Sequence, residues 1–152
     1  MALHLRDQIM DALATLLTGL TTTGTRVYLD RDTDTEPLGT DQFPGLTMEQ
    51  RDDVAENLTL GGRVFQRSLN VEVVAHVKRV TGTQARKQLN LINQEIEVAL
   101  YSDRSLGGLC KYINPGNFDF STAGDADLVV ARMTMQFNVI YLYAEGAPDV
   151  PL

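Results

Sequence analysis

The stretches SLNVEVVAHVK (residues 68–78) and LVVARMTMQFNVIYLY (residues 128–143) decide the fold of this chain. Apolar side chains occupy every second position of both, which is typical of a strand with one face against a core. The first face holds Leu69, Val71, Val73, Ala75 and Val77, and the second holds Val129, Ala131, Met133, Met135, Phe137, Val139, Tyr141 and Tyr143. We therefore expect two long strands, the first starting as early as Arg63 if Gly61-Gly62 forms the preceding turn.

Two segments repeat apolar residues at the helical spacing of three and four. The first, over residues 5–20, carries a stripe of Leu, Ile and Ala and ends near Gly19. The second, over residues 84–101, follows Thr83, a residue type that often caps helix N-termini. The sequence therefore predicts two amphipathic helices, the first at the start of the chain and the second between the two long strands.

The remaining segments predict short strands and loops. Residues 25–29 are rich in strand-forming types, and Phe43-Pro44-Gly45-Leu46 fits an edge strand or a strand start. Residues 30–42 are polar and are expected to be a loop, and residues 49–57 are expected to be another loop or an arm. The stretch Asn114-Pro115-Gly116-Asn117 is expected to be a turn. Residues 144–152 contain two prolines and are expected to form a loose tail.

These elements predict an α+β fold in a single domain over residues 1–152. The expected sheet is small and mostly antiparallel, with about four strands and two helices packed on it. A strand of 16 residues would span about 50 Å, whereas a compact chain of this length is about 40 Å across. We therefore expect a long β-ribbon that extends from the body, with a bulge that divides the last strand as the alternative.

Composition excludes several classes of protein. The chain has 152 residues, a formal net charge of −7 and one cysteine, Cys110. An acidic chain is a poor non-specific DNA binder, because cationic side chains supply affinity for phosphate. One cysteine excludes an intrachain disulfide. No apolar run approaches the length of a membrane span, and Asp7 and Asp11 interrupt any signal-like segment, so we expect a soluble intracellular protein without a membrane partner.

The sequence contains few candidate catalytic or metal-binding residues, and most of them fit structural or solvent-exposed positions. The acidic residues 30–41 resemble the start of an EF-hand loop, but Thr35 stands where glycine is needed and Asp41 where glutamate is needed. Cys110 has only His76 as a conceivable base, and the carboxylate groups Asp52-Asp53-Glu56 and Asp125-Asp127 fit solvated loops. A basic patch comprises Lys78, Arg79, Arg86 and Lys87. We expect no catalytic residue, no metal site and no cofactor, although cation binding by the acidic loop stays open.

The order of these elements resembles the tail terminator proteins of long-tailed bacteriophages, also called tail completion or lambda-type minor tail proteins. The resemblance covers about residues 3–143. It is carried by the opening helix, the strand Val27-Tyr28-Leu29, the Phe43-Pro44-Gly45-Leu46 re-entry, the strand 69–77, the helix 85–100, the stretch Leu106-Gly107-Gly108-Leu109 and the Tyr-rich strand 130–143.

The resemblance implies a structural virion protein that is not an enzyme. Such proteins form a six-fold ring on the head-proximal end of the tail tube, stop tube growth and provide the surface that joins the head. The implied partners are further copies of the chain, the tail tube protein and a head-completion or connector protein, while DNA passes through the lumen without specific binding. Assembly would take place in the host cytoplasm.

We expect the subunit or tube interface to lie on the long strands. The residues assigned to it are Leu69, Val71, Val74, Val130, Arg132, Ile140 and Leu142. Three alternatives stay open: another head–tail component such as a head-closure protein or a tube subunit, a small carboxylate- or Cys-dependent enzyme, and a calcium-binding module.

Overall fold

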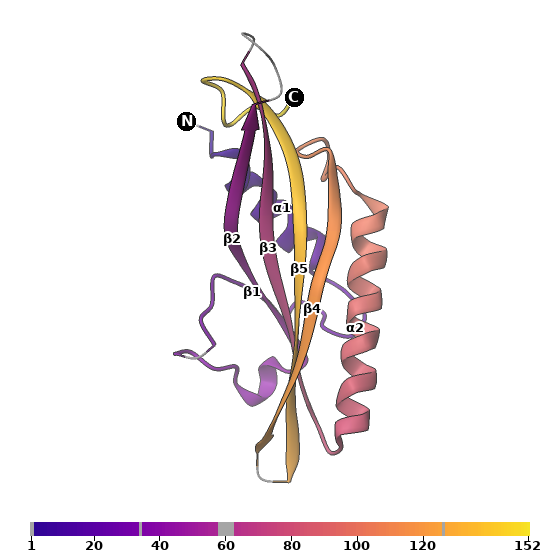
Figure 1. Cartoon of the computed structure of the whole chain (residues 1–152). Helices are drawn as coiled ribbons and strands as arrows, with labels where there is room; N and C mark the ends of the chain where they lie inside the picture. The colour runs from indigo at the N-terminus through magenta and orange to yellow at the C-terminus, as the bar shows by residue number, and fades with distance from the viewer. Residues whose placement is uncertain (1, 34, 58–62, 126) are drawn as a thin grey trace.

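The computed structural model describes every residue except 1, 34, 58–62 and 126 (Figure 1). Its elements follow the order α1 (Leu5–Leu17), β1 (Val27–Leu29), the short 3-10 helix η1 (Thr40–Gln42), β2 (Gly45–Asn57), β3 (Val64–Arg79), α2 (Gly82–Ser102), β4 (Tyr112–Asp125) and β5 (Leu128–Ala144). The expected turn at Gly61-Gly62 lies outside the described residues.

The strands form one five-stranded sheet in the order β1-β2-β3-β5-β4. Only the short β1–β2 pair is parallel, and the other three pairs are antiparallel. The expected α+β class with a mostly antiparallel sheet is therefore confirmed, with one strand more than expected.

Both helices pack on the same face of this sheet. The alternating apolar residues of β3 and β5 form one buried cluster with the apolar stripes of the helices, which include Leu5, Ile9 and Leu13 of α1 and Leu89, Ile92 and Ile96 of α2. The opposite face carries mainly polar side chains, such as Asn70, Glu72, Gln136 and Asn138. The sheet therefore has a helix-covered face and an uncovered face.

The central pair β3–β5 runs without interruption. Its register is continuous from Val64 opposite Ala144 to Arg79 opposite Val129, so a bulge that divides β5 is wrong. These strands have 16 and 17 residues and belong to the same sheet as β2 and β4. A separate ribbon that extends from the body stays a prediction.

Residues 49–57 form the outer half of β2 and not the expected loop. The register of β2 against β3 shifts between Gln50 and Asp53, where β2 contains one extra residue. This bulge interrupts the alternation of residues that would have predicted a strand. Beyond Met48 no strand pairs with the outer side of β2 among the described residues, and an edge strand tolerates polar residues on both faces.

The expected turn at residues 114–117 is also part of a strand, β4. The register with β5 shifts between Pro115 and Phe118, which makes this segment a bulge. A Cβ atom at Gly116 would lie 2.9 Å from the carbonyl oxygen of Gln136, so glycine permits the close approach of the two backbones.

Helix α2 begins two residues before the expected position. Its N-cap is Thr81 and not Thr83, because the Thr81 hydroxyl accepts a hydrogen bond from the backbone N–H of Gln84 at 3.2 Å. Thr83 lies inside the first turn, where it is exposed.

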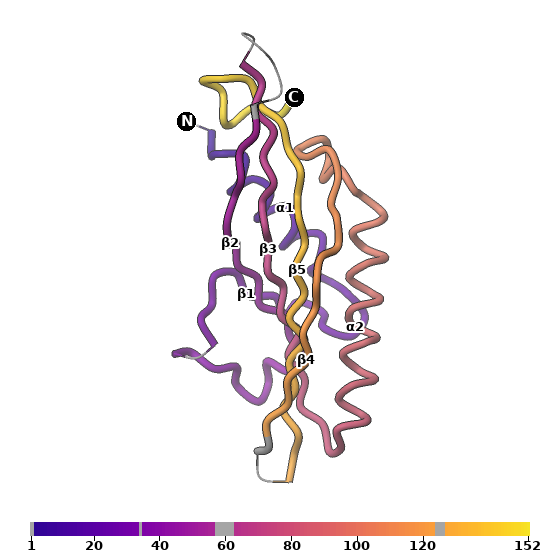
Figure 2. Tube along the Cα trace, viewed as in Figure 1, coloured from indigo at the N-terminus to yellow at the C-terminus, as the bar shows by residue number. Residues whose placement is uncertain are grey.

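The segment after β5, expected to be loose, makes specific backbone contacts. Pro148 accepts a hydrogen bond from the N–H of Leu5, and the N–H of Leu152 donates to the carbonyl of Leu142. Figure 2 shows the two ends of the chain at the same end of the sheet. These contacts join the segment to the start of α1 and to β5.

Candidate interaction surfaces

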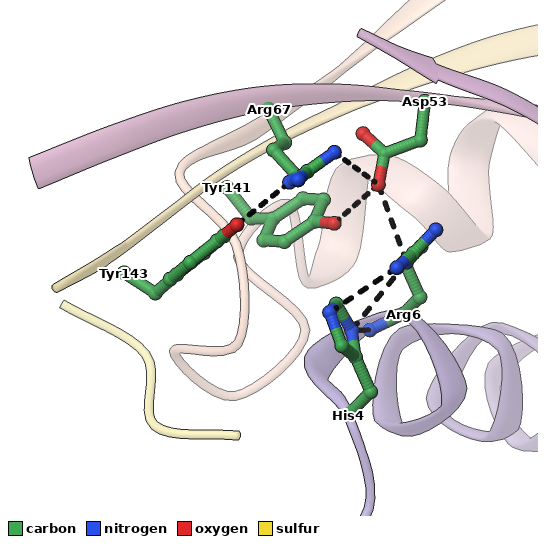
Figure 3. Close-up of polar contacts among 6 residues, drawn as sticks. All are labelled: His4, Arg6, Asp53, Arg67, Tyr141 and Tyr143. Atoms are coloured by element: carbon green, nitrogen blue, oxygen red, sulfur yellow. Dashed lines mark hydrogen bonds and ion pairs between the residues drawn. The ribbon is translucent and has the colours of Figure 1, made fainter. Parts of the chain in front are cut away.

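A buried polar cluster links α1 to the sheet at the point where β2 changes register (Figure 3). Asp53, at the bulge, has a side chain only 5% exposed. Its Oδ2 accepts a 2.6 Å hydrogen bond from the Tyr141 hydroxyl and lies 3.3 Å from Nε of Arg6 and 3.7 Å from Nη1 of Arg67. One carboxylate therefore holds together α1, β2, β3 and β5.

The aromatic and histidine neighbours complete this cluster. Nε of Arg67 donates to the Tyr143 hydroxyl at 2.8 Å, and this bond raises the pKa of Arg67. Burial, followed by the bond to Asp53, raises the pKa of Tyr141 well above its usual range. His4 caps α1 by accepting from the N–H of Arg6, and partial burial lowers its pKa.

The arrangement holds separate elements together through one carboxylate. Asp52 and Asp53 point to opposite faces of the sheet, since Asp52 accepts from Asn70 on the uncovered face while Asp53 faces the helices. They therefore do not act as a carboxylate pair. Sequence analysis missed the cluster because the bulge, which sets the direction of Asp53, has no simple sequence signal.

His76 lies on the sheet face opposite the helices, at a place where the loop before β2 covers that face through residues such as Thr33, Pro37 and Leu38. Its Nε2 lies 2.9 Å from the Thr47 hydroxyl, and a small cavity of about 220 Å³ beside it is lined by residues that include Phe43, Lys78, Val130 and Arg132. Burial lowers the pKa of His76 to about 4, helped by the positive charges of Arg132 and Arg31. His76 is thus neutral at physiological pH and covered, and not the surface residue that its sequence position suggests.

Cys110 lies elsewhere, in the segment between α2 and β4. Its thiol is buried and donates to the carbonyl of Arg104 at 3.3 Å, and burial raises its pKa to about 11. At neutral pH the sulfur is therefore protonated and a poor nucleophile. His76 contacts Thr47 instead, so the structure does not bring the two together.

The charged segments do not assemble a metal site in the part of the chain that the structure describes. No group of three or more His, Cys, Asp or Glu side chains converges there. Asp34 of the EF-hand-like stretch lies outside the described residues, as does the side chain of Asp125. In the basic patch, Lys78 lies over the Phe43 ring at 5.9 Å.

An open hollow lies on the described surface between α2 and the start of β4. It is an open groove of about 800 Å³, lined by residues that include Val98, Tyr101 and Arg104 of the α2 side and Tyr112, Ile113 and Pro115 of β4. Tyr101 is 71% exposed, and Phe118, further along β4, is 61% exposed. Large apolar side chains exposed on α2 and β4 of a single chain favour burial against a partner.

The seven residues expected at an interface fall into two groups. Leu69 and Val71 are 0% exposed and lie in the core beneath the helices, so they are not on the surface of the single chain. The other five lie on the uncovered face, where Arg132 is exposed and Ile140 is largely buried: Val74, Val130, Arg132, Ile140 and Leu142. Val130 and Arg132 also line the cavity beside His76.

Comparisons with known proteins do not assign a family. A scan against protein-family models finds no match, and a search of curated proteins finds no significant match. Among the described helices, none is both long enough and apolar enough to cross a bilayer.

Proposed function

We propose that this chain is a tail terminator of a long-tailed bacteriophage. Six copies form a ring on the head-proximal end of the tail tube, stop the addition of tube subunits and offer a surface to the head-completion protein. The mechanism depends on the shape of the ring. Its outer face differs from the face of a tube ring, so no further ring of tube subunits can be added to it.

The observation that carries this proposal is the exposed apolar surface along α2 and β4. Side chains such as Val98, Tyr101 and Phe118 are more than half exposed in the single chain, which favours burial against a partner. A closed ring requires two different complementary surfaces on each copy, and an unpaired sheet edge beside an apolar groove is one such surface.

Charge and reactivity support a structural role for the chain. The net charge of −7 disfavours adhesion to DNA that passes through a lumen. The raised pKa of the Cys110 thiol argues against a cysteine-dependent enzyme.

We assign the uncovered face of the sheet to the tail tube. Val74 and Leu142 are half-buried there and expose apolar atoms among polar neighbours. Lysine at either position keeps the stem against the sheet but adds a charge that must be desolvated when the tube docks.

Electron microscopy of tail tubes from the same genome tests the proposal. The native chain is expected to sit at one end of each tube, whereas Val74→Lys and Leu142→Lys are expected to leave the ends bare. Asp11→Lys, on the exposed side of α1, serves as the matched control and is expected to cap normally.

The outcomes separate two claims. If the native chain does not bind tube ends, or if it lengthens tubes as a tube subunit would, the terminator function is wrong. If folded Val74→Lys and Leu142→Lys still cap tubes, only the assignment of the uncovered face is wrong.

A further inference from the structure

The sheet of one copy ends in two different unpaired edges. On one side β4 pairs only with β5, so the outer backbone groups of β4 have no strand partner in the described chain. On the other side β1 pairs with Leu46–Met48 of β2, and β2 from Arg51 onward has a strand partner only in β3. Such edges readily accept a further strand.

The strand directions allow one of these edges to pair with the other edge of a neighbouring copy. β1 and β2 are parallel to each other, and the successive antiparallel pairs β2–β3, β3–β5 and β5–β4 make β4 run opposite to both. A ring places every copy in the same orientation and joins one surface to a different surface on the next copy. β4 would therefore meet the β1–β2 edge of its neighbour as an antiparallel partner.

Exposed apolar side chains occur at matching positions on the two edges. One row of the ladder joins Tyr112, Ile140, Ser68 and Val54, and another joins Phe118, Met135, Val73, Met48 and Leu29. Both ends of each row are exposed: Tyr112 and Val54 by 45% and 62%, and Phe118 and Leu29 by 61% and 36%. Because paired residues share a face, the two ends of each row also lie on the same face of the sheet.

The charges near the row that joins Tyr112 to Val54 are complementary. Exposed Lys111 directly precedes β4 and exposed Arg104 lines the groove beside Tyr112, whereas exposed Asp52 and Glu56 flank Val54 on β2. Docking along the rows places opposite charges near each other and steers the two edges into one alignment.

We propose that β4 of one copy pairs with the β1–β2 edge of the next copy, with Tyr112 against Val54 and Phe118 against Leu29. This inference rests on the ring of the proposed function and names the contact that closes it. The pairing joins the sheets of successive copies and covers the apolar surface along β4.

Disulfide cross-linking tests this contact directly. Within one copy, Val54 and Tyr112 are three strand spacings apart, about 14 Å, well beyond the roughly 7 Å between Cα atoms that a disulfide tolerates. The double variant Val54→Cys/Tyr112→Cys can therefore link only different copies. Native Cys110 is buried and stays in place.

The experiment uses the full chain, free and bound to tail tubes, under mild oxidation. Both matched pairs, Val54→Cys/Tyr112→Cys and Leu29→Cys/Phe118→Cys, are expected to give a ladder of covalent oligomers. The mismatched pairs Val54→Cys/Phe118→Cys and Leu29→Cys/Tyr112→Cys serve as controls. They are expected to give at least about tenfold less product, since the geometry of a disulfide is restrictive.

The outcomes distinguish the contact between copies from the terminator function. Capping of tubes without preferential linkage of the matched pairs overturns the edge pairing and leaves the terminator function standing. Preferential linkage without capping supports the contact and contradicts the terminator function. Absence of linkage in the variants together with absence of capping by the native chain overturns both.

Discussion

At the scale of single residues, Asp53 of β2 has partners from three other elements. Its carboxylate meets Arg6 from α1, Arg67 from β3 and Tyr141 from β5, while its second oxygen, Oδ1, has no partner within the described structure. Removing the charge of this buried carboxylate leaves the partly buried guanidinium groups of Arg6 and Arg67 without their counter-ion, which destabilises the fold.

Asp53→Asn is therefore expected to lower the free energy of unfolding by about 3 kcal/mol. The matched control is Asp52→Asn, a neighbouring exposed carboxylate, for which a change within about 0.5 kcal/mol is expected. Urea denaturation of the three proteins measures both values. Equal small losses at the two positions would contradict a structural role for the cluster.

The buried His76 makes stability depend on pH in a defined direction. Its folded-state pKa of about 4 lies below the unfolded value of 6.5, so between these values the unfolded chain binds a proton that the folded chain does not. Stability is therefore fully present above pH 6.5 and declines as the pH falls toward 4. Between pH 7.5 and 5.0 the loss from His76 alone is expected to be about 2 kcal/mol.

His76→Gln is expected to remove most of this pH-dependent loss, because an amide can still bond to Thr47 but does not titrate. His4→Gln serves as the comparison, since His4 is less buried and its pKa is lowered in the same direction. Urea denaturation at the two pH values measures the difference. If His76→Gln loses as much stability between the two pH values as the native protein does, His76 is not the source of the pH dependence.

At the scale of elements, the two capping candidates of α2 differ in their contacts. The Thr81 hydroxyl accepts from the N–H of Gln84, whereas Thr83 is exposed in the first turn. Thr81→Ala is expected to lower the free energy of unfolding by about 1 kcal/mol, and Thr83→Ala by less than about 0.5 kcal/mol. The reverse ranking in thermal or urea unfolding would restore Thr83 as the cap.

Sequence patterns predicted the elements that have one buried face and one solvated face, and they missed the elements whose two faces are similar in polarity. β3 and β5 alternate because one face is buried against helices, and the stripes of α1 and α2 repeat for the same reason. The outer half of β2 is solvated on its free edge and interrupted at Asp53, so its polar residues indicated a loop. β4 contains Pro115 and Gly116, which usually mark turns but here form a bulge.

The candidate surfaces were predictable to a smaller extent. The alternation indicated which residues of β3 and β5 share a face, but it did not show which face the helices cover, so Leu69 and Val71 were assigned to an interface although they lie in the core. The groove beside β4 depends on how α2 sits relative to the sheet edge, a tertiary relation that no local pattern encodes.

At the scale of the whole molecule, the chain presents surfaces that a single copy leaves unsatisfied. The sheet has two unpaired edges of opposite direction, β4 on one side and β1–β2 on the other (Figure 1). Apolar side chains such as Tyr101, Tyr112 and Phe118 stay exposed in the single chain. Because the two edges differ, one edge of a copy can contact the other edge of the next copy in a head-to-tail arrangement. Such a contact closes into a ring when the rotation from one copy to the next is a whole fraction of a full turn.

The most direct measurement of the central claim is the growth of tail tubes from purified tube protein, followed by electron microscopy over time. Added in an amount far below that of tube subunits, the chain is expected to stop elongation and to appear only at tube ends. Continued growth at the original rate, or the chain distributed along the length of the tubes, would contradict the account.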